Sequence, residues 1–401
     1  MLDTWPPLPI DIWGSDLRLW NVDNIIAALE HNDRINKIEF WDFSLFHLEQ
    51  AFAAMRKPFP SLTKLAVNFF SERAALVVPD LFLSGSAPLL RSLRLRCTRF
   101  QPQILRNLLL STTNLVELRI WKIPGSGFIS PEAMVVCLST LTRLEEFELG
   151  FRSPHIWRSR HLPSSTHCVL PALTSLLFNG CYEYLDHLIA PIDSPLLDNL
   201  DVIVFHQPEI DTAQLAQFID RTLKLKALRE AHIILDSLCV FVSLPSTYHR
   251  GLHFRITQMA VLSNPLSIMV QLCTLSFLRT LIPMMRHLYI LDSGLPSYYW
   301  LNHVESSRWA DLFGRFTAVE DLYLPWEFSL RIVPALHEII GEGTMEVLPS
   351  LQNLFLEKKP PSGPVEKSIG QFASPLCLSN RSITVSQRSR VHDSLWKHNN
   401  R

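Results

Sequence analysis

The sequence lacks an excess of charge of either sign. Its 401 residues include 37 lysines and arginines against 38 aspartates and glutamates, which leaves a net charge of -1. Proteins that attract nucleic acid or anionic membranes through general electrostatics usually carry a basic patch or a basic overall balance. The composition therefore predicts neither nucleic acid nor a membrane as a partner.

Paired cysteines are also missing. None of the 7 cysteines belongs to a C-x-x-C pair, and their number is odd. In a chain this long, such scatter is typical of reduced thiols in the cytoplasm or nucleus. The stretch from Met1 to Ile10 lacks the basic and apolar regions of a signal peptide. We therefore expect a cytoplasmic or nuclear protein.

A long, purely apolar run is absent too. The stretch from Ile256 to Leu278 carries no charge, but it contains Asn264, Pro265 and Gln271 among other polar residues. A membrane-spanning helix needs about 20 predominantly apolar residues. The stretch favours a strand followed by a buried helix over a transmembrane helix.

Patterns typical of catalysis are missing as well. We find no serine–histidine–aspartate order, no nucleophile elbow and no pair of catalytic carboxylates. The glycine pair around Ser126 is too short for a phosphate-binding loop and indicates a turn. The sequence therefore predicts a protein that is not an enzyme and has no cofactor. A hydrolase or transferase hidden in an irregular array is kept as a minor hypothesis.

One segment, residues 152–169, holds side chains that suit zinc, namely His155, His161, His167 and Cys168. Their spacing fits no usual zinc pattern, and the segment also contains several arginines. We interpret it as a polar insertion and predict no metal site.

What the sequence has in abundance is a six-residue pattern of an apolar residue, two variable residues, an apolar residue, one variable residue and a third apolar residue. The first apolar positions of neighbouring copies lie 24 to 34 residues apart, which overlaps and stretches the period of leucine-rich repeats. The clear copies are Ile35-Ile38-Phe40, Leu62-Leu65-Val67, Leu90-Leu93-Leu95, Leu115-Leu118-Ile120, Leu144-Phe147-Leu149, Leu173-Leu176-Phe178, Leu197-Leu200-Val202, Met285-Leu288-Ile290, Val319-Leu322-Leu324 and Leu351-Leu354-Leu356. Three less regular stretches are Leu228-Ala231-Ile233, Leu252-Phe254-Ile256 and a closing strand at Ile383-Val385.

The last two apolar positions of each copy are two residues apart. A strand turns both into one core and turns the residue between them to the opposite face. Segments with helical spacing lie between the copies, at residues 22–31, 130–140, 211–222, 328–340 and 364–372. Strand, crossover helix and strand imply parallel pairing. The pattern predicts an α/β fold, a leucine-rich-repeat-like solenoid (horseshoe) with a parallel inner sheet and outer helices.

The same pattern predicts the domain organisation. A single solenoid covers residues 21–386, after an N-terminal extension at 1–20 and before a polar tail at 387–401. The repeats fade over residues 236–284, where we expect an irregular stretch with a long apolar helix from about Pro265 to Leu281.

Several stretches carry a family resemblance. One is Asn21 to Arg34, another runs from Ser130 to Phe151, a third runs from Leu170 to His232, and the last runs from Trp309 to Phe372. Through them the chain resembles a large family of F-box and leucine-rich-repeat-like proteins from mushroom-forming fungi. Together they cover most of residues 21 to 386.

The resemblance implies a role in ubiquitin transfer. In family members with a complete architecture, an F-box upstream of the repeats docks on a Skp-type adaptor of a cullin ubiquitin ligase. The repeats would then hold the protein that is to be ubiquitinated. We find no F-box helices before the first repeat here, so only the repeat half carries over, and adaptor binding requires an F-box upstream. A stand-alone repeat scaffold without a link to ubiquitin is the alternative.

The face of the sheet opposite the core is where we expect a protein partner to bind. Rigid aromatic residues and arginine are common anchors in protein interfaces. The alternative is a solvated face on which cross-strand charge pairs, such as Arg119 with Glu148, serve solubility and register. The candidate residues are Arg94, Arg96, Arg119, Trp121, Glu146, Glu148, Asp201, Tyr289, Tyr323 and Phe355.

Overall fold

The computed structural model divides the chain into two compact units, residues 1–207 and residues 208–401, which we describe separately. The structure describes residues 8–15, 22–69, 76–124, 129–152, 167–205, 212–222, 224–225, 228–235, 239–247, 250–257, 275–292, 306–325, 328, 332, 347–357, 376–378 and 381–388.

The first unit is built on a parallel sheet. Its strands, in spatial order, are β1 (Ile10–Ser15), β2 (Ile35–Trp41), β3 (Lys64–Asn68), β5 (Ser92–Arg96), β7 (Glu117–Ile123), β8 (Glu146–Phe151), β10 (Ser175–Gly180) and β12 (Asn199–Phe205). Two short parallel pairs join β4 (Leu76–Val77) to β6 (Thr98–Arg99) and β9 (Cys168–Val169) to β11 (Ile192–Asp193).

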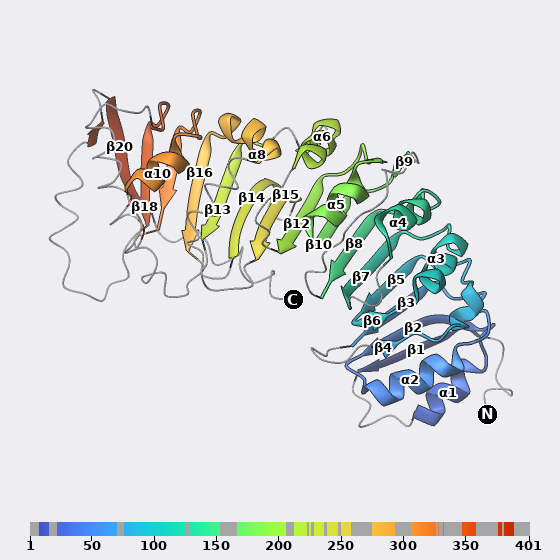
Figure 1. The fold of residues 1–401 in the computed structure, drawn as a ribbon. Helices are drawn as coiled ribbons and strands as arrows, with labels where there is room; N and C mark the ends of the chain where they lie inside the picture. The colour runs from blue at the N-terminus through green and yellow to red at the C-terminus, as the bar shows by residue number, and fades with distance from the viewer. Residues whose placement is uncertain are drawn as a thin grey trace, which may run out of the picture. The chain divides into compact units, whose positions relative to one another are not determined.

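Helices connect successive strands of this unit and cover one face of its sheet (Figure 1). They are α1 (Val22–Leu29), α2 (Leu45–Ala54), the 3₁₀ turn η2 (Phe82–Gly85), α3 (Pro102–Ser111), α4 (Pro131–Leu138) and α5 (Tyr182–Ile189). The helix expected at 130–140 begins as predicted, because the Ser130 hydroxyl accepts a hydrogen bond from the Ala133 amide at 3.2 Å and Pro131 opens the helix.

Burial along the strands follows the apolar pattern. On β5, Leu93 and Leu95 are buried, whereas Arg94 between them is partly exposed. The same alternation recurs on β7, where Leu118 and Ile120 are buried on either side of Arg119. The prediction of a leucine-rich-repeat-like solenoid is confirmed. We call the sheet face that carries the residues between the buried pairs the open face.

The second unit contains both parallel and antiparallel strands. In spatial order they are β15 (Arg250–Thr257), β14 (Cys239–Thr247), β13 (Glu230–Leu235), β16 (His287–Asp292), β17 (Asp321–Leu324), β18 (Asn353–Glu357), β20 (Arg381–Arg388) and β19 (Leu376–Leu378). Its described helices are α6 (Ala213–Arg221), α8 (Ser276–Leu281), the 3₁₀ turn η5 (Ile282–Met284) and α10 (Ser306–Phe313).

The stretch expected to be irregular contains an antiparallel hairpin. β14 pairs antiparallel with β13 and with β15, so the copy at Leu252-Phe254-Ile256 is a strand of this hairpin and not a further parallel repeat. β13 also pairs in parallel with β16, so the hairpin lies on the other side of β13. Of the apolar helix expected up to Leu281, the structure describes α8 from Ser276 onward, and residues 258–274 lie outside the described part.

The two ends of the predicted array gave different outcomes. Strand β1 lies within residues 1–20, which we expected to be an extension, and it pairs in parallel with β2. The closing strand expected at Ile383-Val385 is present as β20, which pairs in parallel with β18. Most of the helices expected at 328–340 and 364–372 lies outside the described residues.

None of the helices within the described ranges has the length and apolarity that crossing a membrane requires.

Candidate protein-binding face

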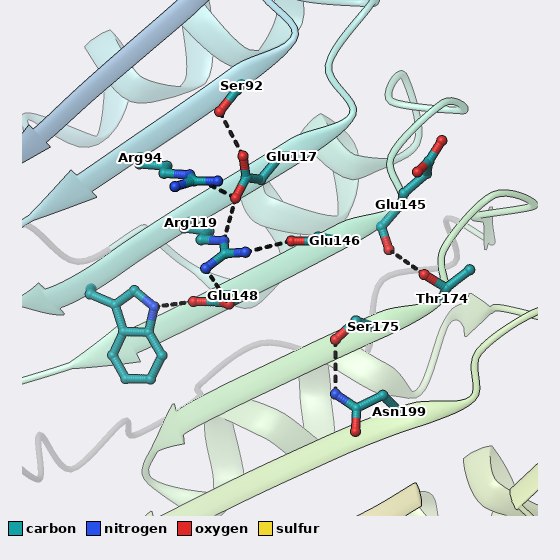
Figure 2. Close-up of polar contacts among 11 residues, drawn as sticks. Ser92, Arg94, Glu117, Arg119, Glu145, Glu146, Glu148, Thr174, Ser175 and Asn199 are labelled. Carbon is teal, nitrogen blue, oxygen red and sulfur yellow. Dashed lines mark hydrogen bonds and ion pairs between the residues drawn. The ribbon is translucent and has the colours of Figure 1, made fainter. Parts of the chain in front are cut away.

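The open face of the first unit carries its polar residues in rows, because the parallel strands pair in register. One row contains Ser92, Glu117 and Glu146, which face one another across β5, β7 and β8. The next row contains Arg94, Arg119 and Glu148 on the same strands. Each strand therefore presents two polar residues that are two positions apart, both charged on β7 and β8, and neighbouring strands place these pairs side by side (Figure 2).

Contacts between the rows form one connected network. Glu117 accepts hydrogen bonds from the Ser92 hydroxyl at 2.7 Å and from Arg94 Nε at 2.7 Å. Arg119 forms ion pairs with three carboxylates: that of Glu117, that of Glu146 at 2.6 Å and that of Glu148 at 3.2 Å. Figure 2 shows the Arg119 guanidinium between the carboxylates of β7 and β8. We call these six residues the charge network.

Trp121 extends this network at the end of β7. Its indole N–H donates a hydrogen bond to Glu148 Oε2 at 2.5 Å. The ring lies against Gly150 on β8, where an added Cβ would approach Trp121 Cε3 to 2.6 Å. A glycine is therefore required on the neighbouring strand for the indole to lie flat against the sheet. Arg96, another candidate residue, lies in register with Trp121.

The pKa values of the two most buried carboxylates of the network, those of Glu117 and Glu148, are shifted in opposite directions. Burial raises the pKa of Glu117, but the hydrogen bonds from Arg94 and Ser92 and the charge of Arg119 outweigh burial and hold that pKa below its ordinary value. Burial also raises the pKa of Glu148, and here Arg119 and Trp121 do not compensate, so this pKa lies above its ordinary value. For Arg119, burial lowers the pKa, but the charge of Glu148 and the other carboxylates raise it overall.

The structure thus forms the cross-strand pair between Arg119 and Glu148 that the alternative interpretation requires. Arginines and carboxylates from neighbouring strands interleave here, so they do not form separate basic and acidic patches. The remaining candidate residue of this unit, Asp201, lies on β12 in register with Leu177 of β10.

The open face of the second unit carries a row of aromatic residues. Tyr289, Tyr323 and Phe355 lie in register on β16, β17 and β18. The rings of Tyr289 and Tyr323 stack with centroids 4.0 Å apart at an interplanar angle of 6°. Those of Tyr323 and Phe355 stack at 4.5 Å and 14°.

The row continues onto β13, where the sequence analysis had not singled out a residue. His232 lies in register with Tyr289, and the two ring centroids are 4.6 Å apart. A signal for this residue was present, since His232 stands between Ala231 and Ile233 in the weak copy of the pattern. We call His232, Tyr289, Tyr323 and Phe355 the aromatic ladder.

A carboxylate is fixed beside the aromatic ladder. Asp321 lies two residues before Tyr323 on β17, and its two oxygens contact His287 Nδ1 at 2.8 Å and Asn353 Nδ2 at 2.8 Å. These partners come from the strands on either side of β17. Neighbouring strands therefore set the position of this carboxylate.

The segment considered for zinc is described only in part. His155 and His161 lie outside the described residues, and His167 Nε2 contacts Asp193 Oδ2 at 2.7 Å. Burial raises the pKa of the Cys168 thiol to about 11. A thiol with so high a pKa is a poor metal ligand or nucleophile at neutral pH. Within the described residues, no group of three or more candidate ligands could hold a metal ion.

Cys137 of α4 has a similar environment, since burial raises the pKa of its thiol to about 11. The turn around Ser126 lies outside the described part of the chain. The described surface thus presents fixed charges on one unit and stacked rings on the other.

The chain was compared with protein-family models, curated proteins and solved structures. No protein-family model matches the chain. A comparison with curated proteins also finds no match. Among solved structures, the chain is similar to the leucine-rich repeat-containing protein LegL7 from Legionella pneumophila, with 14% sequence identity and a TM-score of 0.31. The similarity covers 87% of this chain and 91% of that protein's chain.

Proposed function

We propose that this protein is a non-enzymatic interaction module whose open sheet face binds another protein. The observation that carries the proposal is that one face of each strand is buried in the core, whereas the other face presents side chains that are partly exposed and fixed in position. The apolar pairs of the repeats are buried on one face, as Leu288 and Ile290 are. The side chains between them, such as Tyr289, are partly exposed and already held in place by contacts across strands.

This prior ordering favours binding. A flexible side chain that becomes immobilised at an interface costs about 0.5–1.5 kcal/mol of affinity. Arg119 in the charge network is held by carboxylates of its own strand and of β8, and Tyr323 in the aromatic ladder stacks against rings of both neighbouring strands. Much of their entropy is therefore lost on folding, before any partner arrives.

The proposal is tested by photo-crosslinking from two positions, one on the open sheet face and one on a helix. Phe355 on the open face and Phe46 on α2 are each replaced by the photoreactive analogue p-benzoylphenylalanine, which preserves an aromatic ring at both sites. Phe46 is the matched control, because its side chain is exposed and lies on a helix. The variants are irradiated in extracts of the cells that make the protein.

We expect discrete cross-linked proteins from position 355 that are absent from position 46. Identical products from both positions, or products from position 46 alone, would contradict binding through the open face. Circular dichroism of both variants before irradiation shows that each is folded as the unmodified protein is.

We further propose that the bound protein is a ubiquitination substrate and that the repeats act as the recognition part of a cullin ligase receptor. Support comes from the resemblance carried by stretches such as Leu170 to His232. The buried thiols of Cys137 and Cys168, which form no disulfide, support a reducing compartment, the cytoplasm or nucleus.

Co-purification of the complete gene product with a Skp-type adaptor tests this narrower proposal. Retention of the adaptor supports a receptor role. If the adaptor is lost while the partners cross-linked at position 355 are kept, the stand-alone scaffold is the correct description.

A further inference from the structure

The strands that carry the aromatic ladder have an unusual charge composition. β13, β17 and β18 carry Glu230, Asp321 and Glu357 at the positions that alternate onto the face of the ladder, and neither these strands nor β16 contain a lysine or arginine. Of the two strands that flank this group, β14 contains no charged residue, and β20 contains arginine at positions 381 and 388. Aromatic rings and carboxylates thus share one strip of the sheet, from which lysine and arginine are missing.

From this charge complementarity we infer that the aromatic ladder is a docking surface for a basic, arginine- or lysine-containing segment of the partner protein. The inference rests on the proposed function and names the chemistry of the partner. The carboxylates beside the ladder accept charge-assisted hydrogen bonds from guanidinium or ammonium groups. The apolar rings receive the aliphatic stems of the same side chains.

The protein itself shows that this face accommodates an arginine over a ring. On the adjoining hairpin, the guanidinium carbon of Arg255 lies 5.1 Å from the ring centroid of Phe241. Both residues alternate onto the sheet face opposite Phe254 and Val242, and the Phe241 ring beneath the guanidinium is itself buried. An arginine from a partner would meet rings of the same kind two strands further along.

Asp321 is the carboxylate best placed for this role. It stands beside the Tyr323 ring on the same strand, and it is oriented by His287 and Asn353. Its side chain has 17% of its surface exposed, so a partner's cation can reach it without the strand having to move. A carboxylate that is both oriented and partly desolvated binds a cation more strongly than a fully solvated one.

The test uses three fluorescent 12-residue peptides and the full chain. Each peptide alternates one residue type with glycine and serine, and that residue is arginine, the neutral arginine analogue citrulline, or glutamate. Binding is followed by fluorescence anisotropy. We expect the arginine peptide to bind at least about tenfold more tightly than the other two, because only its side chains carry positive charge. Equal affinity for the arginine and citrulline peptides would overturn the inference.

Three variants locate the site. Asp321→Asn removes one open-face carboxylate and Tyr323→Ala removes one ring, and we expect each to weaken the arginine peptide about two- to fivefold. Glu146→Gln is the matched control, since it removes an open-face carboxylate from the other unit, where Glu146 is 45% exposed. If Glu146→Gln weakens binding as much as Asp321→Asn does, binding is general electrostatic attraction and the inference is wrong. Asp321→Asn keeps the shape of the side chain, so the test holds even if Tyr323→Ala fails to fold.

A competition experiment separates this inference from the proposed function. Excess arginine peptide should suppress the cross-links formed from position 355. If those cross-links persist unchanged, the open face binds its partner through other chemistry, and only the basic segment is ruled out. If position 355 gives no specific cross-links at all, the proposed function itself fails.

Discussion

At the scale of the residue, the absence of a Cβ at Gly150 allows Trp121 to contact the charge network. Gly150 has no Cβ, so the Trp121 indole lies over the backbone of β8 and reaches Glu148. The indole N–H is one of the groups that offset the burial of the Glu148 carboxylate. Position 150 therefore controls a contact that is made by two other side chains.

We expect Gly150→Ala to displace Trp121 and to lower the free energy of unfolding by about 1–3 kcal/mol, as overpacking usually does. Urea denaturation followed by tryptophan fluorescence measures the loss. In a Trp121→Ala background there is no indole to displace, so the same substitution should cost much less. An equal cost in both backgrounds would show that the indole does not cause the strain.

The two enclosed carboxylates should respond to pH in opposite directions. The lowered pKa of Glu117 means that its ionised form stabilises the fold above the ordinary glutamate pKa, and this contribution is lost as the pH falls through the folded-state pKa. The raised pKa of Glu148 means that its ionised form costs stability at neutral pH, and this cost disappears on acidification.

Glu117→Gln should therefore destabilise the protein by about 1–2 kcal/mol near neutral pH, with a deficit that shrinks toward about pH 3. Glu148→Gln keeps an acceptor for Trp121 and should leave stability at neutral pH unchanged or slightly higher. Urea titrations at several pH values compare the two variants. Parallel pH profiles for both would contradict the assignment of opposite pKa shifts.

Sequence reasoning reached part of this site. The rows could be predicted, because aligning the apolar triplets places Arg119 beside Glu148 and Tyr289 beside Tyr323. The fit of Trp121 over Gly150 could not, because it depends on how the backbone of one strand approaches a ring from the next. His232 was missed because the neighbouring Ala231 made its copy of the pattern look too weak to count.

At the scale of the element, strands and helix starts were predictable where local chemistry is unambiguous. The triplet Leu115-Leu118-Ile120 predicted β7, and Ser130 predicted the beginning of α4. The direction of a strand was not predictable from the same pattern. Alternation places side chains on the two faces identically in parallel and antiparallel strands, so the pattern did not reveal that an antiparallel strand, β14, pairs with both β13 and β15.

Ser130 offers a test of how much a helix start contributes. Ser130→Ala removes the acceptor for the Ala133 amide and should cost about 1 kcal/mol of unfolding free energy. Ser130→Asp retains an acceptor and should cost far less. Thermal and urea unfolding of both variants provide the comparison, and equal losses would mean that the cap does not stabilise α4.

At the scale of the whole molecule, the chain forms two compact units, whereas the repeat pattern alone predicted one solenoid over residues 21–386. Apolar triplets mark strands in both units and so do not reveal a boundary between them. The single solenoid remains a prediction. We propose that the first unit is able to fold by itself, because its described strands have their own buried core.

We expect a fragment of residues 1–207 to unfold cooperatively and to retain the fluorescence of Trp121 in its native setting. A fragment of residues 1–180 lacks α5 and β12 and so uncovers Leu176 and Phe178, and it should unfold at a much lower urea concentration. Circular dichroism and fluorescence follow both. Non-cooperative unfolding of the longer fragment would show that the second unit is required for the first to fold.

The hairpin of β14 and β15 limits how this array can evolve. A parallel coil gains or loses one whole turn by gene duplication or deletion, and every later strand still runs in its original direction. β14 runs antiparallel to both β13 and β15, and the chain then returns to β16, which lies beside β13 and parallel to it. Losing β14 or β15 alone would leave the chain at the wrong end of the sheet. Descendants of this gene should therefore keep or lose the two strands together, even where the number of ordinary repeats varies.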